Sequence, residues 1–128
     1  MPNFTAFVTL LAVILYFWIG FWVGQARVRF GVKAPATTGN PDFERAFRIQ
    51  MNTLEQMALF LPALWLYAAY VSDRGAAVGG LVWVVGRVIY ALAYTRDPAS
   101  RGPGAMITLF ASVGLWLGGA YGVVRALI

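Results

Sequence analysis

Three polar side chains in the segment 43–55 recur at helical spacing. Arg48, Asn52 and Glu55 are four and three residues apart, so a helix places them in one row on one face. Such a row is about 10 Å long. A cation, an amide and a carboxylate at this spacing can hold the charged ends of a zwitterionic, peptide-like ligand. An internal Arg–Glu pair that stabilises the bundle is the alternative, and spacing alone does not separate the two interpretations.

A second polar face is predicted downstream, where Arg87, Tyr90 and Tyr94 share one side of a helix. A charge is costly within a membrane, so Arg87 needs a partner. Glu55 is the best candidate, because it is the only acid expected at that depth. The tyrosines also fit an interfacial aromatic belt. Arg101 follows in the next polar segment, either as a topological arginine or as a cation over a bound anion.

The composition indicates the scaffold that must position these residues. Of 128 residues, 60% are apolar and 12% are charged. A soluble monomer of this size cannot bury so much apolar surface. We therefore expect one all-α membrane domain, 1–128, a bundle of four membrane-spanning helices at about 4–24, 41–71, 76–94 and 105–124. The chain has no cysteine or histidine, which excludes a Ser-His-Asp triad and thiolate or imidazole metal sites.

The basic residues indicate the orientation of this multi-pass protein. The net charge is +5. The first and third loops carry Arg27, Arg29, Lys33, Arg96 and Arg101, whereas the second loop and the termini carry only Arg74 and Arg125. The positive-inside rule places these two loops in the cytoplasm and both termini on the opposite side. This distribution does not favour nucleic acid as a partner. The segment 4–24 lacks a basic n-region and a cleavage site, so we expect it to be a retained helix rather than a signal peptide.

Glycines repeat at intervals of four residues in three of the predicted helices, which lets helix backbones approach closely. These glycines are Gly20 and Gly24, Gly75 and Gly79, and Gly114, Gly118 and Gly122. Packing within one chain and packing between chains both remain open. At the start of the second helix, Asn40 is the expected N-cap and Pro41 the first helical residue.

These motifs resemble a known family. The segment 43–55 reads FERAFRIQMNTLE and is similar to the FERxxRxQxNxxE signature of the MAPEG family, the membrane-associated proteins in eicosanoid and glutathione metabolism. Residues 87–94 resemble the RxxYxxxY stretch of its third helix. Residues 34–39 and 96–101 resemble its first and third loops. The resemblance extends over essentially the whole chain in length, helix count and motif order.

The resemblance implies a homotrimer of four-helix subunits, with sites between neighbouring subunits near the cytoplasmic face and glutathione as the cosubstrate, without a metal. By similarity to the microsomal glutathione transferase and leukotriene C synthase branch, Arg101 would activate the thiol and Trp116 would line a crevice for a lipophilic substrate. The implied glutathione-binding residues are Arg27, Arg48, Gln50, Asn52, Glu55, Tyr90 and Tyr94.

The expected function is therefore that of a membrane-embedded glutathione transferase, with peroxidase turnover as a side activity. Its partners would be glutathione, a lipophilic electrophile or lipid hydroperoxide, membrane lipid and further copies of itself. A non-catalytic lipid-binding or lipid-presenting relative is the alternative. A small multidrug transporter is disfavoured, because segment 4–24 contains no acid. Val28 and Gln56 depart from the leukotriene C synthase pattern and leave an eicosanoid substrate open.

Overall fold

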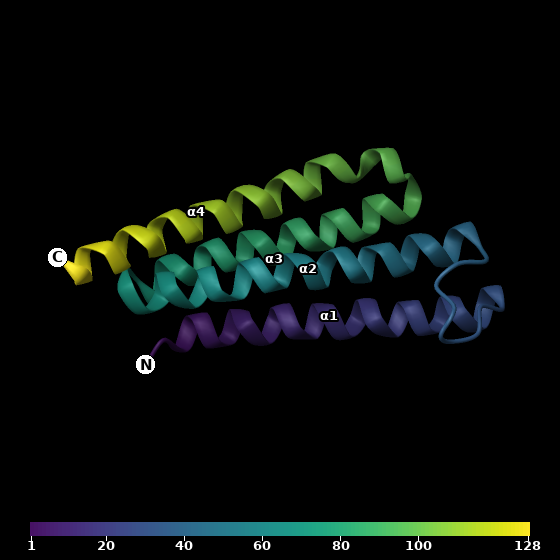
Figure 1. Cartoon of the computed structure of the whole chain (residues 1–128), viewed down its shortest axis with the longest axis horizontal. Helices are drawn as coiled ribbons and strands as arrows, with labels where there is room; N and C mark the ends of the chain where they lie inside the picture. Colours follow the sequence, from purple (N-terminus) through teal and green to yellow (C-terminus); the bar gives the residue numbers. More distant parts are fainter.

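The computed structural model describes residues 1–128 and contains four long helices packed lengthwise (Figure 1). Successive helices run antiparallel, so the two termini lie at one end of the bundle (Figure 1). The opposite end carries the α1–α2 loop and the α3–α4 connection, and we name it the loop end. The helices are α1 (Asn3–Phe30), α2 (Pro41–Tyr70), α3 (Asp73–Arg96) and α4 (Gly102–Leu127), with a short 3-10 helix, η1 (Pro98–Arg101), before α4. The prediction of a four-helix, all-α fold is confirmed.

Three of the helical segments are long and apolar enough to cross a membrane: α1, α3, and η1 together with α4. α2 differs because its N-terminal half carries the polar row of the predicted site. Large apolar side chains face outward, as a lipid environment requires; Phe17 is 74% exposed and Phe110 is 67% exposed. The prediction of a helical membrane protein is confirmed.

The predicted C-terminal end of the first helix was wrong. α1 continues six residues beyond Gly24, to Phe30. Nothing between these residues breaks a helix, and Arg27 and Arg29 favour its last turn, where cations interact well with the carbonyl end. Gly31 then ends α1 in the left-handed conformation, with φ of 69°. The apolar run therefore ends before the helix does, and both arginines lie on α1 rather than in a loop.

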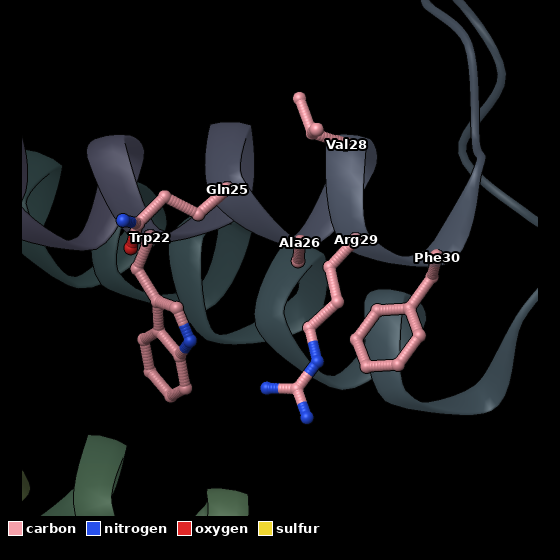
Figure 2. Close-up of a pocket in the computed structure, with 6 residues that line it drawn as sticks. All are labelled: Trp22, Gln25, Ala26, Val28, Arg29 and Phe30. Carbon is pink, nitrogen blue, oxygen red and sulfur yellow. The ribbon is translucent and has the colours of Figure 1, made fainter.

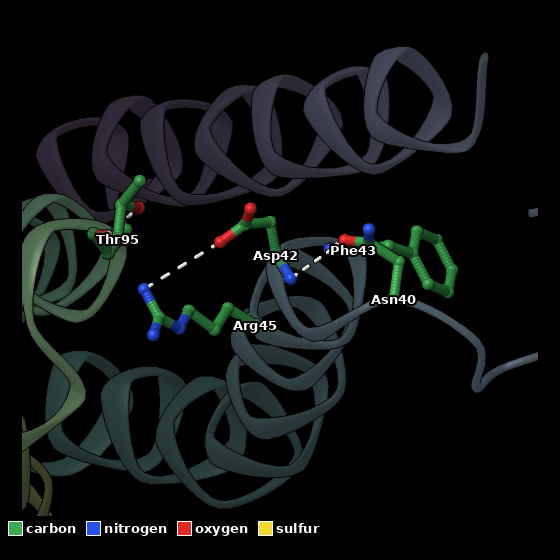
Figure 3. Close-up of polar contacts among 6 residues, drawn as sticks. Asn40, Asp42, Phe43, Arg45 and Thr95 are labelled. Atoms are coloured by element: carbon green, nitrogen blue, oxygen red, sulfur yellow. Dashed lines mark hydrogen bonds and ion pairs between the residues drawn. The ribbon is translucent and has the colours of Figure 1, made fainter. Parts of the chain in front are cut away.

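The other helix ends follow capping residues. Asn40 is the N-cap of α2, as predicted, and its side chain accepts hydrogen bonds from the backbone N–H groups of Asp42 and Phe43 (Figure 3). Ser72 caps α3, which therefore begins three residues earlier than predicted. Pro103 lies in the first turn of α4, and this helix begins at Gly102, three residues earlier than predicted.

The core lies where the four helices meet. Phe60 of α2 and Trp83 of α3 stack at its centre, with ring centroids 4.1 Å apart and planes 3° apart. At the terminal end, the Asp73 carboxylate accepts hydrogen bonds from the backbone N–H groups of Phe4 and Thr5 and from the Thr5 hydroxyl. The first residue of α3 thus satisfies donors at the start of α1, which fixes the two helices together.

Several glycines allow close packing within the chain. A Cβ added at Gly104 of α4 would lie 2.5 Å from the backbone nitrogen of Tyr90 on α3, and one at Gly118 would lie 2.3 Å from the Tyr67 ring. A Cβ at Gly24 or Gly114 would meet nothing within 4 Å. Part of the glycine pattern is therefore explained by packing inside one chain.

Gly104→Ala is expected to destabilise the protein, because the backbone of Tyr90 cannot move aside as a flexible side chain can. Overpacking of this kind costs about 1–3 kcal/mol. Gly114→Ala is the matched control on the same helix and should leave stability unchanged or slightly raised. Thermal unfolding in detergent measures both variants. Equal midpoints would show that α3 and α4 do not pack as closely as described.

Candidate functional site

A pocket of about 390 Å³ opens at the loop end of the bundle, between α2, α3 and η1. It brings together six of the predicted site residues and one that the sequence analysis missed. The lining residues are Arg48, Met51, Asn52, Glu55, Tyr90, Tyr94 and Arg101. Met51 is the addition, and helical spacing could have found it, because it lies three residues after Arg48 and four before Glu55.

The α2 side of the pocket is the predicted polar row. Arg48 and Glu55 are exposed, whereas Ile49 and Thr53 on the opposite side of the helix are buried. Neither charge has an ion-pair partner, since the one ion pair in the structure joins Arg45 to Asp42 at 3.8 Å. The internal Arg48–Glu55 pair considered above does not form. Both charges therefore face the pocket without a partner and are available to a ligand.

Arg87 lies beneath this row and is only 1% exposed. The predicted pairing with Glu55 was wrong: the Arg87 Nη2 group donates to Oδ1 of Asn52 at 3.0 Å. Its Nε and Nη1 groups have no hydrogen-bond partner. Its guanidinium carbon lies 3.9 Å from the centroid of the Tyr90 ring. A buried cation thus supports two of the lining residues, Asn52 and Tyr90, from behind.

The α3 side of the pocket consists of two phenol rings, and Arg101 reaches them from η1. Tyr90 and Tyr94 have ring centroids 5.7 Å apart. The Arg101 guanidinium carbon lies 5.7 Å from the Tyr94 ring centroid, and its Nη1 group donates to the Pro98 carbonyl oxygen at 2.7 Å. The Pro98 contact uses only part of the guanidinium, so the exposed Arg101 keeps N–H donors for a ligand.

A second hollow of about 270 Å³ adjoins the pocket and shares Arg48 and Met51 with it. It reaches Thr37 and Thr38 in the α1–α2 loop. The pocket and the hollow together extend from that loop to η1, and most of the residues that line them are polar.

Three predicted site residues lie outside the pocket. Arg27 is turned toward the α1–α2 loop, where its Nη1 group donates to the Ala36 carbonyl oxygen at 2.7 Å, and its guanidinium lies over the Phe43 ring. Gln50 lies close to Gly20 of α1. Trp116 is 59% exposed on α4. Within one chain, these three residues do not come together with the other six.

The pocket therefore combines two separated, unpaired charges on α2 with two phenols and a second guanidinium. This set suits a small zwitterionic ligand that carries an additional anionic group, because each charge of the ligand would meet an opposite charge or a hydrogen-bond donor.

Comparison with known proteins identifies relatives along most of the chain. An uncharacterized protein of Synechocystis is 47% identical over 113 residues, covering 88% of this chain and 82% of its own length. Leukotriene C4 synthase of Bos taurus is 40% identical, covering 88% of this chain and 73% of its own. Human microsomal glutathione S-transferase 2 is 33% identical, covering 96% of this chain and 84% of its own length. Residues 5–121 match the MAPEG family, to which this chain therefore belongs.

Proposed function

We propose that this protein is a membrane-embedded glutathione transferase that joins the glutathione thiolate to lipophilic electrophiles. The observation that carries the proposal is the pocket in which Arg48 and Glu55 are unpaired and Arg101 lies beside Tyr94. Relatives named leukotriene C4 synthase and microsomal glutathione S-transferase 2 support glutathione as the thiol.

The α2 row would bind the charged groups of glutathione. Arg48 would pair with one carboxylate and Glu55 with the ammonium group, because seven residues of helix separate these two side chains by about 10 Å. Asn52 lies between them and would bind a carboxylate or an amide. With the peptide held at both ends, its cysteine thiol would lie toward the tyrosines and Arg101.

Arg101 would then hold the sulfur as a thiolate. A guanidinium stays protonated at neutral pH and stabilises an adjacent anion without exchanging protons. The thiol proton is released to solvent, and the sulfur attacks an electrophilic carbon of the substrate. The C–S bond forms while the leaving group departs with its electron pair, or an activated double bond is saturated. With a lipid hydroperoxide, the thiolate would instead attack the terminal oxygen and break the O–O bond, which gives the alcohol and a sulfenic acid of glutathione. A second glutathione would then attack this sulfenic acid, releasing water and forming glutathione disulfide.

The complete site would be shared between subunits of a homotrimer. Arg27 and Gln50 belong to the implied glutathione-binding set but lie outside the pocket of their own chain, so a neighbouring subunit would supply them. The electrophile would enter from the bilayer along a crevice near Trp116. The loop end would face the cytoplasm, where glutathione is available, because more cations lie at this end of the bundle than at the terminal end, which has Arg74 and Arg125.

Glutathione binding and turnover test the proposed function directly. The purified protein in detergent should bind glutathione in calorimetric titrations. It should also convert chlorodinitrobenzene and glutathione to the thioether with release of chloride. Binding without conjugation of any electrophile would favour the non-catalytic, lipid-presenting alternative. Absence of glutathione binding by a folded protein would reject both the thiol and the assigned pocket.

Arg48→Ala is expected to weaken glutathione binding by about tenfold or more, because a charge-assisted hydrogen bond contributes about 1.5–3 kcal/mol. Arg45→Ala is the matched control: it removes the same charge from the preceding turn of α2, but Arg45 lies outside the pocket. Calorimetry on both variants measures the difference. Equal affinities would show that the α2 row has a structural role only.

A site shared between subunits also predicts the number of chains in the assembled protein. Mass measurement corrected for bound detergent should give three chains per particle. Co-expression of Arg27→Ala and Arg101→Ala chains should restore part of the activity that each variant lacks alone, because mixed trimers contain some sites with both arginines. A monomer with full glutathione affinity would contradict this arrangement.

A further inference from the structure

A groove lies between α1 and α3 at the loop end, and none of its lining residues belongs to the candidate site. Three adjoining hollows of about 530, 240 and 460 Å³ form it, and Trp22 lines all three. Figure 2 shows Trp22 and Arg29 projecting from the same side of α1, while Val28 points to the other side. We name this surface the α1–α3 groove, and its principal residues are Trp18, Trp22, Arg29, Arg45 and Arg96.

Arginines from three helices line this groove: Arg29 from α1, Arg45 from α2 and Arg96 from α3. Asp42 is the one acid among the lining residues, and it lies 3.8 Å from Arg45 (Figure 3). No hydrogen bond to the protein is formed by the guanidinium of Arg29 or Arg96. The groove therefore carries a net positive charge and unused N–H donors.

The same groove has aromatic and apolar walls on the side away from the loop end. Trp18 and Trp22 stack with ring centroids 6.0 Å apart, and Phe21 and Leu92 line the hollow beside them. The apolar surface continues toward the middle of the bundle. Ile14 of α1 and Ile89 of α3 are 61% and 41% exposed, and helical spacing places them on the faces of Trp18 and Leu92. The arginines at the loop end are thus continuous with a row of exposed apolar side chains that runs along α1 and α3 toward the middle of the bundle. We name this row, which includes Ile14 and Ile89, the apolar stripe.

We propose that the α1–α3 groove binds one anionic phospholipid. Its phosphate would lie among Arg29, Arg45 and Arg96, and an acyl chain would follow Trp18, Trp22 and the apolar stripe. This order matches a lipid in one leaflet, whose charged headgroup lies at the interface and whose chain points to the bilayer centre. A soluble anion would leave the apolar stripe unused, and a lipid with a zwitterionic headgroup would leave the excess positive charge unpaired.

Native mass spectrometry of the full chain in detergent tests this proposal with phosphatidylglycerol and phosphatidylcholine of identical acyl chains. The wild type should prefer phosphatidylglycerol by about tenfold, since basic residues near a membrane surface each strengthen binding of anionic lipid severalfold. Arg29→Gln, Arg45→Gln and Arg96→Gln combined should remove the preference. Asp42→Asn should increase it, because the one acid of the groove is lost. Trp22→Ala should weaken both lipids equally.

Lys33→Gln, Arg74→Gln and Arg125→Gln combined are the matched control, because they remove the same number of charges outside the groove. They should retain the preference, whereas equal losses in the two triple variants would mean a net-charge effect and would overturn the proposal. Displacement of the lipid by millimolar inorganic phosphate would identify a site for free anions instead. A changed number of chains in the groove variant would identify an interface between copies. Glutathione affinity is measured separately, so failure of the lipid site would not affect the proposed function.

Discussion

Arg101→Ala is expected to lower turnover at pH 7 by about 25-fold, because the pKa of a free thiol, about 8.5, leaves only about 3% of it ionised. If Arg101 lowers the pKa of the bound thiol to about 6.5, about three-quarters is thiolate at the same pH. Glutathione affinity should change less, because in the proposed site Arg48, Asn52 and Glu55, which line other parts of the pocket, would hold the peptide.

The pH dependence identifies the cause of that loss. The deficit of Arg101→Ala should shrink as the pH rises toward about 8.5, where the thiol ionises without help. A thiolate absorbs in the near ultraviolet, so its titration on the enzyme can be followed directly alongside turnover. The variant should show the same absorbance step as the wild type, but at higher pH.

Two further variants make this experiment specific. Arg101→Lys keeps the charge but loses the planar guanidinium, so it should recover part of the thiolate and not all of it. Arg125→Ala removes a cation at the terminal end of the bundle and should leave the titration unchanged. Wild-type titration and turnover in Arg101→Ala would remove Arg101 from the mechanism, and the Tyr94 hydroxyl would become the next candidate to donate to the sulfur.

The sequence was sufficient to predict the fold but not all of its boundaries. Runs of apolar residues of membrane length identify α1, α3 and α4, and the Asn40–Pro41 pair identifies the start of α2. The errors in the helix boundaries occur where the apolar run ends but the helix continues. Around Arg27 the chain becomes polar but contains no residue that breaks a helix before Gly31, so α1 extends past its apolar run.

The candidate site was also predicted only in part from the sequence. Spacing along α2 and α3 predicts which side chains share a face, and six of those predicted line one pocket. It does not fix how far one helix is shifted along another. A shift of one turn decides whether Arg87 meets Glu55 or Asn52, and only the packed structure identifies Asn52. Arg27 and Gln50 lie outside the pocket of their own chain, and a role for them in the proposed trimer would depend on contacts between chains, which helix spacing cannot predict.

Arg87→Met is expected to separate ligand binding from stability. Arg87 is 1% exposed, makes one hydrogen bond to a neutral amide and leaves two N–H groups without partners. Such a buried charge is costly, and replacing it with an apolar side chain of similar length is often neutral or stabilising. The midpoint of thermal unfolding should therefore stay the same or rise.

Glutathione affinity should fall in the same variant by about tenfold, the effect of losing a hydrogen bond from a charged donor. Asn52 would lose the donor that orients its amide, and Tyr90 would lose the cation over its ring. The KM for glutathione should rise while kcat at saturation changes much less, because Arg87 lies behind the lining residues and does not contact the sulfur.

A double-mutant cycle with Asn52→Ala tests whether Arg87 acts through Asn52. If it does, the affinity lost in the double variant should be clearly less than the sum of the two single losses. Arg87→Lys is the conservative variant: it keeps a donor near Asn52 and should retain part of the affinity. Two results would contradict this role: strictly additive losses of glutathione affinity, or a loss of affinity that only parallels a loss of thermal stability. Either result would mean that Arg87 is a packing residue and does not orient Asn52.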